Sequence, residues 1–546
     1  MRVTCFVIVS VLIAPFNAGL AHNSPRHLAQ RPAAPQVTVG ANIKQLRFDW
    51  TQTPRAQYYK LLKDRDGHSG FRQIGRNIPG SLTSAIDNIA VHFHDWSDAR
   101  YIVAACNKHG CTRSGEISTT HLMLDSIGYL KSGEPKFADF FGDTIALSGD
   151  GKTLAVRAYD DPNSGIVWVY RRTMGAWHQE ELPILEARQP GSNFGYSLRL
   201  SDDGNTLAVG ASWFHVPGGP TETRCDPWTC EEVSAHGAVH IFKRNHAGAW
   251  RQEALLHAPE LRIGQTFGVD LALSGDGRTL VAGSSDGPND VTAHYVLRRT
   301  ASGWQHETVV RPLRTNGRCF DPALTTDGQR LFLACDFHDV ENQTRSGEEI
   351  QIRERTAGAW PLTASLPYSV NHSGPFQFTY SVDRHGRTIA MREWVDGRPV
   401  ISIYTPEVSD SSSWTLHSRL TEAAPNVPFY KFGRGNVVLS GDGTTLVVGD
   451  FQESSAGAGI LETPSPSGVQ AGGAFVFRRS NDTWNFRALI KAPNPDNRDE
   501  FGAPLAVSIK GTTIAIAARV ESSAAQGIDG DQNDNSLSSA GAVYLY

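Results

Sequence analysis

The sequence predicts an all-β protein in which a seven-bladed β-propeller follows a smaller β-sandwich. Three observations carry this prediction. One pattern recurs about seven times, Asp-Gly turns separate alternating apolar runs, and the incomplete last copy can be completed by a segment that precedes the first. A period of roughly fifty residues is typical of an array of supersecondary units and not of one globular core.

Each copy of the pattern predicts four short antiparallel strands. The clearest copy comprises residues 194–212 (FGYSLRLSDDGNTLAVGAS), residues 237–244 (GAVHIFKR) and Trp250. Asp-Gly between two apolar runs indicates a hairpin, because both central residues of the turn need positive φ. Four-stranded units repeated along a chain predict a β-propeller. First strands are expected near Phe141, Phe194, Phe267, Cys319, Phe376, Phe432 and Phe501, and fourth strands at Trp177, Trp250, Trp304, Trp360, Trp414 and Trp484.

The two ends of the repeat region predict how the ring closes. The last copy stops at its third strand, residues 541–546 (GAVYLY), without a Trp or a fourth strand. Residues 126–142, before the first Phe-Gly, parallel residues 486–502 before the last. Residues 126–132 are therefore expected to complete the last blade of a propeller spanning 126–546, which hides the edges that an open array would expose.

The N-terminus predicts export. Arg2 precedes an apolar run at residues 5–16, and small residues at 19–21 suit a cleavage site, so residues 1–21 are interpreted as a signal peptide. The alternative, an uncleaved membrane anchor, has an apolar core that is short for a span. Residues 22–35 are a polar, Pro/Ala-rich linker. The mature chain is expected to be secreted, periplasmic or at the cell surface, without membrane insertion.

The charge balance argues against one class of partner. Lys and Arg number 51 against 56 Asp and Glu, whereas a nucleic-acid-binding domain is strongly basic. No nucleic acid is expected as a partner, and the chain is expected to be a monomer.

Residues 36–123 lack the repeat, and their apolar and polar residues alternate as in β-strands. Trp50 on an early strand, Tyr58 and Tyr59 on the next, and Tyr101 at the start of a late strand resemble a fibronectin type III sandwich, a fold that buries an early Trp. His92 and His94 share one face of a predicted strand; with no third ligand evident, an exposed polar face is expected there rather than a metal site.

Six cysteines remain after the signal peptide, in three local pairs. An even number in an exported protein favours disulfides over zinc, for which CxxC spacing is lacking. The predicted pairs are Cys106/Cys111, Cys225/Cys230 and Cys319/Cys335. A two-residue turn at Asp327-Gly328 would place Cys335 one residue out of register with Cys319, so this third bridge requires a β-bulge.

The repeated FG…SGDGxTLAVGA…GAVYVF…W pattern resembles bacterial FG-GAP proteins, which are relatives of the integrin α-chain propeller. The resemblance covers about three quarters of the chain and implies the propeller fold. Two differences from the family pattern limit what the resemblance implies. The Pro of Gly-Ala-Pro is missing in every copy, and the tight SGDG turn stands where integrin-type propellers hold Ca²⁺ in an extended loop. That turn is too short to supply six to eight oxygen ligands, so those metal sites are not expected.

The connections between second and third strands hold the candidate binding residues. Three are long, at residues 212–236, 450–471 and 520–540, and in integrin-like propellers this connection lies on the ligand-binding face. The first carries Trp213, Phe214, His215 and Trp228 beside the predicted Cys225–Cys230 bridge. Exposed aromatic rings suit a protein partner or a stacked sugar; the alternative is that they only pack the loop onto its blade.

The last of these loops is a candidate calcium site. Asp529, Asp531, Asp534 and Asn535 follow a D-x-D-x-x-D-N spacing that could gather hard oxygen ligands. The alternative is an ordinary loop, because Asp, Asn and Gly are the residues that turns use. No other cofactor is expected.

The preferred function is a secreted, non-enzymatic binding or adhesion-type protein that recognises a protein or surface glycan through the face with the long loops. No nucleophile elbow or HExxH helix is present, and no catalytic residue is predicted. The alternative is a propeller-type glycosidase or polysaccharide lyase with an accessory fibronectin III domain, which would need paired carboxylates in the central funnel.

Overall fold

The computed structural model describes residues 30–161, 164–183, 189–225, 230–233, 235–285, 292–313, 317–339, 344–369, 380–407, 413–421, 435–465 and 468–546. The predicted signal peptide and residues 22–29 of the linker lie outside this part. The described chain consists of β-strands and three single-turn 3-10 helices, η1 (Val91–Phe93), η2 (Thr120–Leu122) and η3 (Leu124–Ser126). None of the described helices is long and apolar enough to cross a membrane. The all-β prediction is confirmed.

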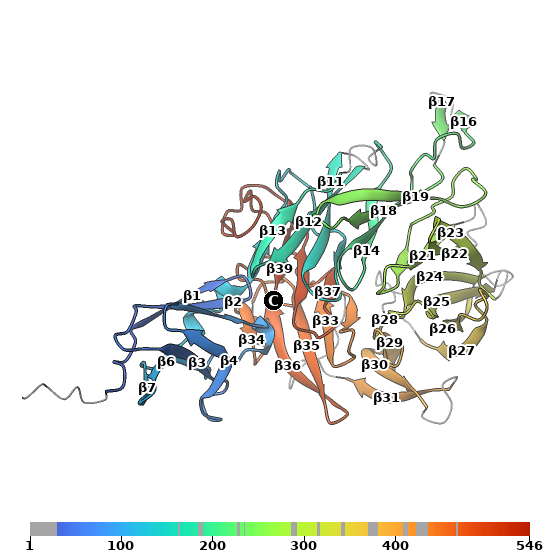
Figure 1. Cartoon of the computed structure of the whole chain (residues 1–546). Helices are drawn as coiled ribbons and strands as arrows, with labels where there is room; N and C mark the ends of the chain where they lie inside the picture. The colour runs from blue at the N-terminus through green and yellow to red at the C-terminus, as the bar shows by residue number, and fades with distance from the viewer. Residues whose placement is uncertain are drawn as a thin grey trace, which may run out of the picture.

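The N-terminal strands form two sheets that pack face to face (Figure 1). The Trp50 ring lies 5.1 Å from the Tyr59 ring, and the Phe48 ring lies 4.8 Å from the Tyr101 ring. Because each ring pair joins the two sheets, one apolar core holds them together. One sheet contains β1 (Val37–Asn42), β2 (Gln45–Trp50) and β5 (Ser84–Asn88); the other contains β4 (Arg72–Pro79), β3 (Tyr58–Asp64), β6 (Arg100–Asn107), β7 (Gly110–Arg113) and β8 (Ile117–Ser118).

Apart from a separate two-stranded hairpin at residues 222–233, the remaining strands form the predicted repeated antiparallel sheets, called sheets one to seven in chain order. Sheet one is β10 (Ile145–Leu147), β11 (Thr153–Asp161), β12 (Ser164–Thr173) and β13 (Ala176–Glu180); sheet two is β14 (Phe194–Leu200), β15 (Thr206–Ala211), β18 (Ala238–Arg244) and β19 (Trp250–Leu256); sheet three is β20 (Leu271–Leu273), β21 (Thr279–Ser285), β22 (Thr292–Thr300) and β23 (Gly303–Val310). Sheet four is β24 (Gly317–Leu324), β25 (Arg330–Asp339), β26 (Thr344–Glu354) and β27 (Leu362–Pro367); sheet five is β28 (Tyr380–Val382), β29 (Ile389–Val395), β30 (Arg398–Pro406) and β31 (Trp414–Leu420). Sheet six is β32 (Val437–Leu439), β33 (Thr445–Asp450), β35 (Gly473–Ser480) and β36 (Thr483–Lys491), with β34 (Gly459–Leu461) as a fifth strand beside β36; sheet seven is β37 (Leu505–Val507), β38 (Ile514–Ala518), β39 (Ala542–Leu545) and β9 (Gly128–Leu130).

Backbone hydrogen bonds between the turns that join the first two strands of each sheet connect these sheets in a closed ring. Each turn lies between the first and second strands of its sheet, and the bonds return from the seventh turn to the first. The donors and acceptors are Asp150 N to Asp202 O, Asp202 N to Gly275 O, Asp276 N to Thr326 O, Thr326 N to Arg384 O, Arg384 N to Gly441 O, Asp442 N to Ile509 O, and Ile509 N to Gly149 O, at 2.8–3.2 Å. The repeated turn therefore bonds to its neighbours as well as closing its own hairpin.

In sheets one, two, three and seven the Phe-Gly motif packs the sheet onto the one before it in the ring. Phe141, Phe194, Phe267 and Phe501 are fully buried. The following glycine has positive φ, and a Cβ at Gly268 would lie 2.8 Å from the carbonyl oxygen of Ala238 on the third strand of sheet two. Only glycine permits this conformation and this close approach. Of the other predicted strand starts, Phe376 and Phe432 lie outside the described residues.

Sheet seven contains the segment predicted to complete it. Strand β9 pairs with β39, with Tyr129 opposite Tyr544 and Leu130 opposite Val543. Residues far apart in the sequence thus share one sheet, and the edge of β39 is covered.

Two of the predicted disulfides are present, Cys106–Cys111 and Cys319–Cys335. In sheet four Cys319 stands directly opposite Cys335, and the register shifts between Phe320 and Ala323. This irregularity is the bulge that the sequence required. Cys225 and Cys230 are opposite each other on β16 (Glu222–Cys225) and β17 (Cys230–Val233), and their predicted bridge lies outside the described side chains. Disulfides are typical of proteins outside the reducing cytoplasm.

Removing the Cys319–Cys335 bridge should lower the free energy of unfolding by about 3 kcal/mol, because the two residues close a loop of 16 residues in the unfolded chain. The double variant Cys319→Ala/Cys335→Ala would be compared with the native chain by thermal unfolding. A reducing agent should lower the native melting temperature more than that of the variant. Equal sensitivity of the two would contradict the prediction.

The sandwich docks on one side of the ring, beside sheets six, seven and one (Figure 1). His92 Nε2 lies 2.7 Å from Gly511 O in the turn of sheet seven, and Lys44 Nζ donates to Thr512 O at 2.7 Å. From sheet one, Arg172 Nη2 donates to Asn88 Oδ1 at 2.8 Å. These contacts lie on the lower face, the side of the ring with the turns between strands one and two and between strands three and four. The opposite, upper face carries the long loops.

The expectation of an exposed strand face at His92 and His94 is wrong. His92 belongs to η1 and His94 follows it, and their exposed fractions are 0% and 6%. His92 is buried where η1 meets the ring, whereas His94 packs against Trp96 and Tyr101 inside the sandwich.

Candidate functional site

Among the described side chains of the first long loop on the upper face, one aromatic ring is exposed. Trp213 is 48% exposed, whereas Phe214 is buried and its ring lies 5.0 Å from that of His240 in the core of sheet two. His215 is half-buried, with its ring 5.5 Å from the ring of His236. Trp228 lies outside the described residues. Of the aromatic residues predicted to meet a partner, Trp213 is the one shown to be accessible.

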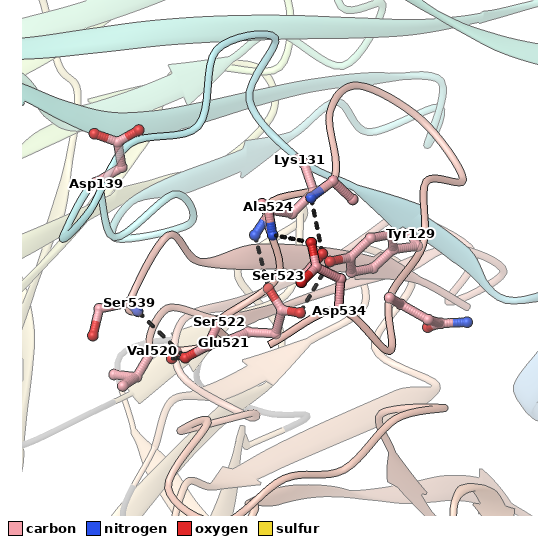
Figure 2. Close-up of polar contacts among 12 residues, drawn as sticks. Tyr129, Lys131, Asp139, Val520, Glu521, Ser522, Ser523, Ala524, Asp534 and Ser539 are labelled. Carbon is pink, nitrogen blue, oxygen red and sulfur yellow. Dashed lines mark hydrogen bonds and ion pairs between the residues drawn. The ribbon is translucent and has the colours of Figure 1, made fainter. Parts of the chain in front are cut away.

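The loop of sheet seven is organised by a buried ion pair (Figure 2). Lys131 Nζ lies 2.8 Å from Glu521 Oε2, both side chains are at most 1% exposed, and Tyr129 donates to Glu521 Oε1 at 3.0 Å. Lys131 and Tyr129 come from the segment that completes the sheet, and Glu521 follows β38. Burial lowers the pKa of Lys131, and the Glu521 carboxylate opposes that shift. The pair fixes the start of the loop to the ring.

The candidate calcium ligands in this loop accept backbone hydrogen bonds. Asp529 Oδ1 accepts from Tyr129 N, Asp531 Oδ1 from Asn533 N, and the two oxygens of Asp534 from Ala524 N and Ser536 N. Within the described part of the chain, no group of three His, Cys, Asp or Glu residues could hold a metal ion. The geometry therefore gives the calcium hypothesis no support, and the observed bonds are those of an ordinary turn-rich loop.

Sheet six repeats the same ion pair, which the sequence analysis missed. Lys491 Nζ lies 2.8 Å from Glu453 Oε2, and Ser455 N donates to Glu453 Oε1 at 2.6 Å. The sequence does contain a signal for this repetition. The tetrapeptide ESSA follows the second strand in both sheets, at residues 453–456 and 521–524, and a Lys ends the fourth strand of sheet six and directly follows that of sheet seven. Two adjacent loops on the upper face are thus each held by a buried Lys–Glu ion pair.

The centre of the ring contains a cavity of about 490 Å³, lined by the first strands of all seven sheets. Arg199 lies on this lining, five residues before the turn glycine of sheet two. The other sheets have small or aliphatic residues at that position. They are Ala146, Ala272, Ala323, Ser381, Val438 and Ala506. Arg199 is therefore the one charged residue at this position among the seven first strands.

Polar groups from sheets three to five surround this arginine. Asp321 lies in the bulge beside the Cys319–Cys335 bridge with φ of 49°, and Tyr380 donates to its carbonyl oxygen at 2.6 Å. Asp321 is exposed to the central cavity, whose walls are the first strands of the ring. Desolvation within the cavity, together with the charge of Asp270, raises the pKa of Asp321 to about 6, although Arg199 opposes the shift.

The neighbouring Asp270 belongs to a buried pair. Its Oδ2 lies 3.6 Å from His294 Nε2, while its Oδ1 and the His294 ring nitrogens have no hydrogen-bond partner among the described residues. Buried polar atoms are rarely left without partners. Another carboxylate of the channel, Asp143, is neutralised by Arg157 at 2.5 Å. Arg199, Asp270, His294, Asp321 and Tyr380 therefore form a polar cluster at the centre of the ring, here called the channel cluster.

Comparisons with known proteins identify no family. No protein-family model matches the chain, and no curated protein matches it. Solved structures similar to it include the β-propeller domain of Cps50 (Swd1) from Myceliophteria thermophila, with 11% identity, coverage of 77% of this chain and 99% of that chain, and a TM-score of 0.44. The Dos1 propeller has 10% identity, covers 77% of this chain and 93% of its own, and has a TM-score of 0.40. A putative 6-phosphogluconolactonase from Bacteroides fragilis has 10% identity, covers 80% of this chain and 96% of its own, and has a TM-score of 0.39.

Proposed function

We propose that the chain is an exported, non-enzymatic binding protein that recognises a protein or surface glycan through the upper face of the ring. In this proposal the seven sheets are blades of one FG-GAP-like propeller, and the N-terminal sandwich is fibronectin III-like. The ring of turn-to-turn hydrogen bonds and the shared core of the sandwich support these assignments.

The position of the sandwich carries the functional proposal. It covers part of the lower face through His92, Lys44 and Arg172. The upper face keeps the long loops, two of which start from buried ion pairs, and an exposed Trp213. Loops held on a rigid scaffold are where proteins of this kind carry recognition, and an accessible Trp is a frequent binding anchor.

A binding screen of the full mature chain against glycans and surface proteins tests the proposal. Trp213→Ala should weaken a specific interaction at least about tenfold, because anchors of this type contribute 2 kcal/mol or more. Met174→Ala is the matched control, since Met174 is exposed on the lower face of sheet one. Equal affinity of the Trp213 variant and the control would contradict a role for the upper face.

The channel cluster favours the alternative, a propeller-type glycosidase or polysaccharide lyase. Two carboxylates from adjacent sheets interact there, and a pKa of about 6 would suit Asp321 for proton transfer near neutral pH. Oligosaccharide turnover by the native chain that is lost in Asp321→Asn would establish this alternative. The binding proposal predicts no turnover by either protein.

A further inference from the structure

A cleft of about 770 Å³ opens between the N-terminal sandwich and sheet six, away from the upper face and the channel. Its lining includes Lys63 and Arg65 at the end of β3, Arg72 at the start of β4, and Arg487 on β36. We propose that this cleft binds a ligand carrying several anionic oxygens, either a polyphosphate or an anionic polysaccharide. Its volume lies within the range of about 300–1,000 Å³ that is usual for ligand pockets.

The basic side chains of the cleft exceed the acidic ones, and most are uncompensated. Arg65, Arg72 and Arg487 form no ion pair with any residue that the structure describes, whereas Lys63 pairs with Asp87 at 3.0 Å. Two carboxylates also line the cleft. Asp66 accepts hydrogen bonds from Ser69 and His68, and Asp95 accepts one from Ser97.

The positive charges of the cleft lower the pKa of a buried histidine. His94 is part of the lining, and burial lowers its pKa to about 3, with further lowering by the charges of Lys63, Arg65 and Arg487. These three cations come from both the sandwich and sheet six. Positive potential therefore converges where the two parts of the chain meet.

Contacts at the junction hold the η1 wall of the cleft against the ring. Phe93 lies beneath the Arg478 guanidinium at 4.5 Å, and the adjacent His92 is bonded to Gly511 O. Guanidinium groups present planar forks of donors that match phosphate, sulfate and carboxylate oxygens. Arg65 and Arg72 are exposed at the rim, and Arg487 is half-buried, so a ligand with several anionic groups can contact both parts of the chain at once.

Calorimetric titration of the full mature chain with sodium tripolyphosphate and with dextran sulfate tests the proposal, with neutral dextran as the negative control. Affinity should fall with added salt. Arg65→Glu and Arg487→Glu should each weaken binding at least about tenfold, because each change removes a charged hydrogen-bond donor and places a negative charge against the anionic ligand. Arg113→Glu on β7 makes the same charge change at an exposed site outside the cleft and should change affinity less than about twofold.

The two probes separate the two sources of anionic oxygens. Binding of tripolyphosphate indicates a compact polyphosphate-like ligand, and binding of dextran sulfate alone indicates an anionic polysaccharide. Either result supports the site when the Arg487 variant no longer binds that probe. Arg487→Gln removes the guanidinium without introducing the carboxylate of Arg487→Glu, so the two variants separate these effects. The melting temperature of each variant checks that it is folded. No binding of either probe, or equal loss in the Arg113 and Arg487 variants, would overturn the proposal.

Discussion

Replacing Lys131 with methionine should lower the free energy of unfolding by about 3–5 kcal/mol. The change leaves the Glu521 carboxylate buried, with the Tyr129 hydroxyl as its remaining side-chain donor among the described residues. An uncompensated buried charge is costly, because the protein interior solvates it poorly. Lys131 also belongs to the segment that closes the ring, so the loss should loosen both β9 and the loop that Glu521 begins. Thermal or urea unfolding measures the effect, and hydrogen exchange at residues 520–540 measures the loosening.

Two control variants separate the buried charge from general damage. Lys131→Met combined with Glu521→Leu removes both charges and should recover most of the loss, since replacing a whole buried pair by apolar residues is often neutral or stabilising. Arg262→Ala removes one partner of the exposed Arg262–Glu260 pair and should change stability by less than about 1 kcal/mol. If Lys131→Met behaves like Arg262→Ala, the pair does not hold the loop.

The stability of the native chain should decrease as the pH rises from about 4 to about 7, and Asp499→Asn should remove most of this dependence. Burial raises the pKa of Asp499 from 3.8 to about 7; the Glu521 and Asp496 charges add to the shift, while the hydrogen bond from Asp496 N and the Lys131 charge oppose it. Between these pH values the folded state binds a proton that the unfolded state has lost, so unfolding becomes easier as the pH increases. The full effect is about 4 kcal/mol, at 1.36 kcal/mol for each pKa unit.

Unfolding by urea at a series of pH values checks this prediction. Above pH 7 the Asn variant should be more stable than the native chain, and near pH 4 the two should converge. The control is Asp125→Asn, which removes an exposed carboxylate and should keep the native pH dependence. A native profile that rises between pH 4 and 7, with no difference in Asp499→Asn, would contradict the assigned environment.

The fold could be predicted because hairpins are local. Asp-Gly turns and alternating apolar runs are specified within about twenty residues, and counting their copies indicated the repeated sheets and the strand needed at the end. The bulge between Phe320 and Ala323 was also predictable, because the Cys319–Cys335 pairing conflicted with a two-residue turn. The prediction for His92 and His94 failed because a period-two pattern of polar residues does not distinguish a solvent-facing strand from a buried segment.

The sites were less predictable because they are built between repeats. Asp270, Asp321 and Arg199 lie on different sheets and are ordinary residues of their own strands. The pairing of Glu521 with Lys131 spans 390 residues, and only its repetition in sheet six offered a sequence signal. Among the predicted aromatic residues, Phe214 and Trp213 are adjacent in the chain, yet one is in the core and the other is exposed, because successive residues point in different directions.

The sequence by itself therefore determined the strands, the turns and the repeated sheets, since these follow from local turn chemistry and apolar periodicity. It also determined that a strand from before the first repeat must complete the last sheet. The tertiary structure decided which face stays open, how Phe-Gly packs against the preceding sheet, and where charged side chains gather in the channel and at the junction. Those outcomes depend on ring closure and domain docking, which bring distant side chains together and exclude water from them. Charge and burial become functional properties only at that stage, because both depend on neighbours that the linear order does not specify.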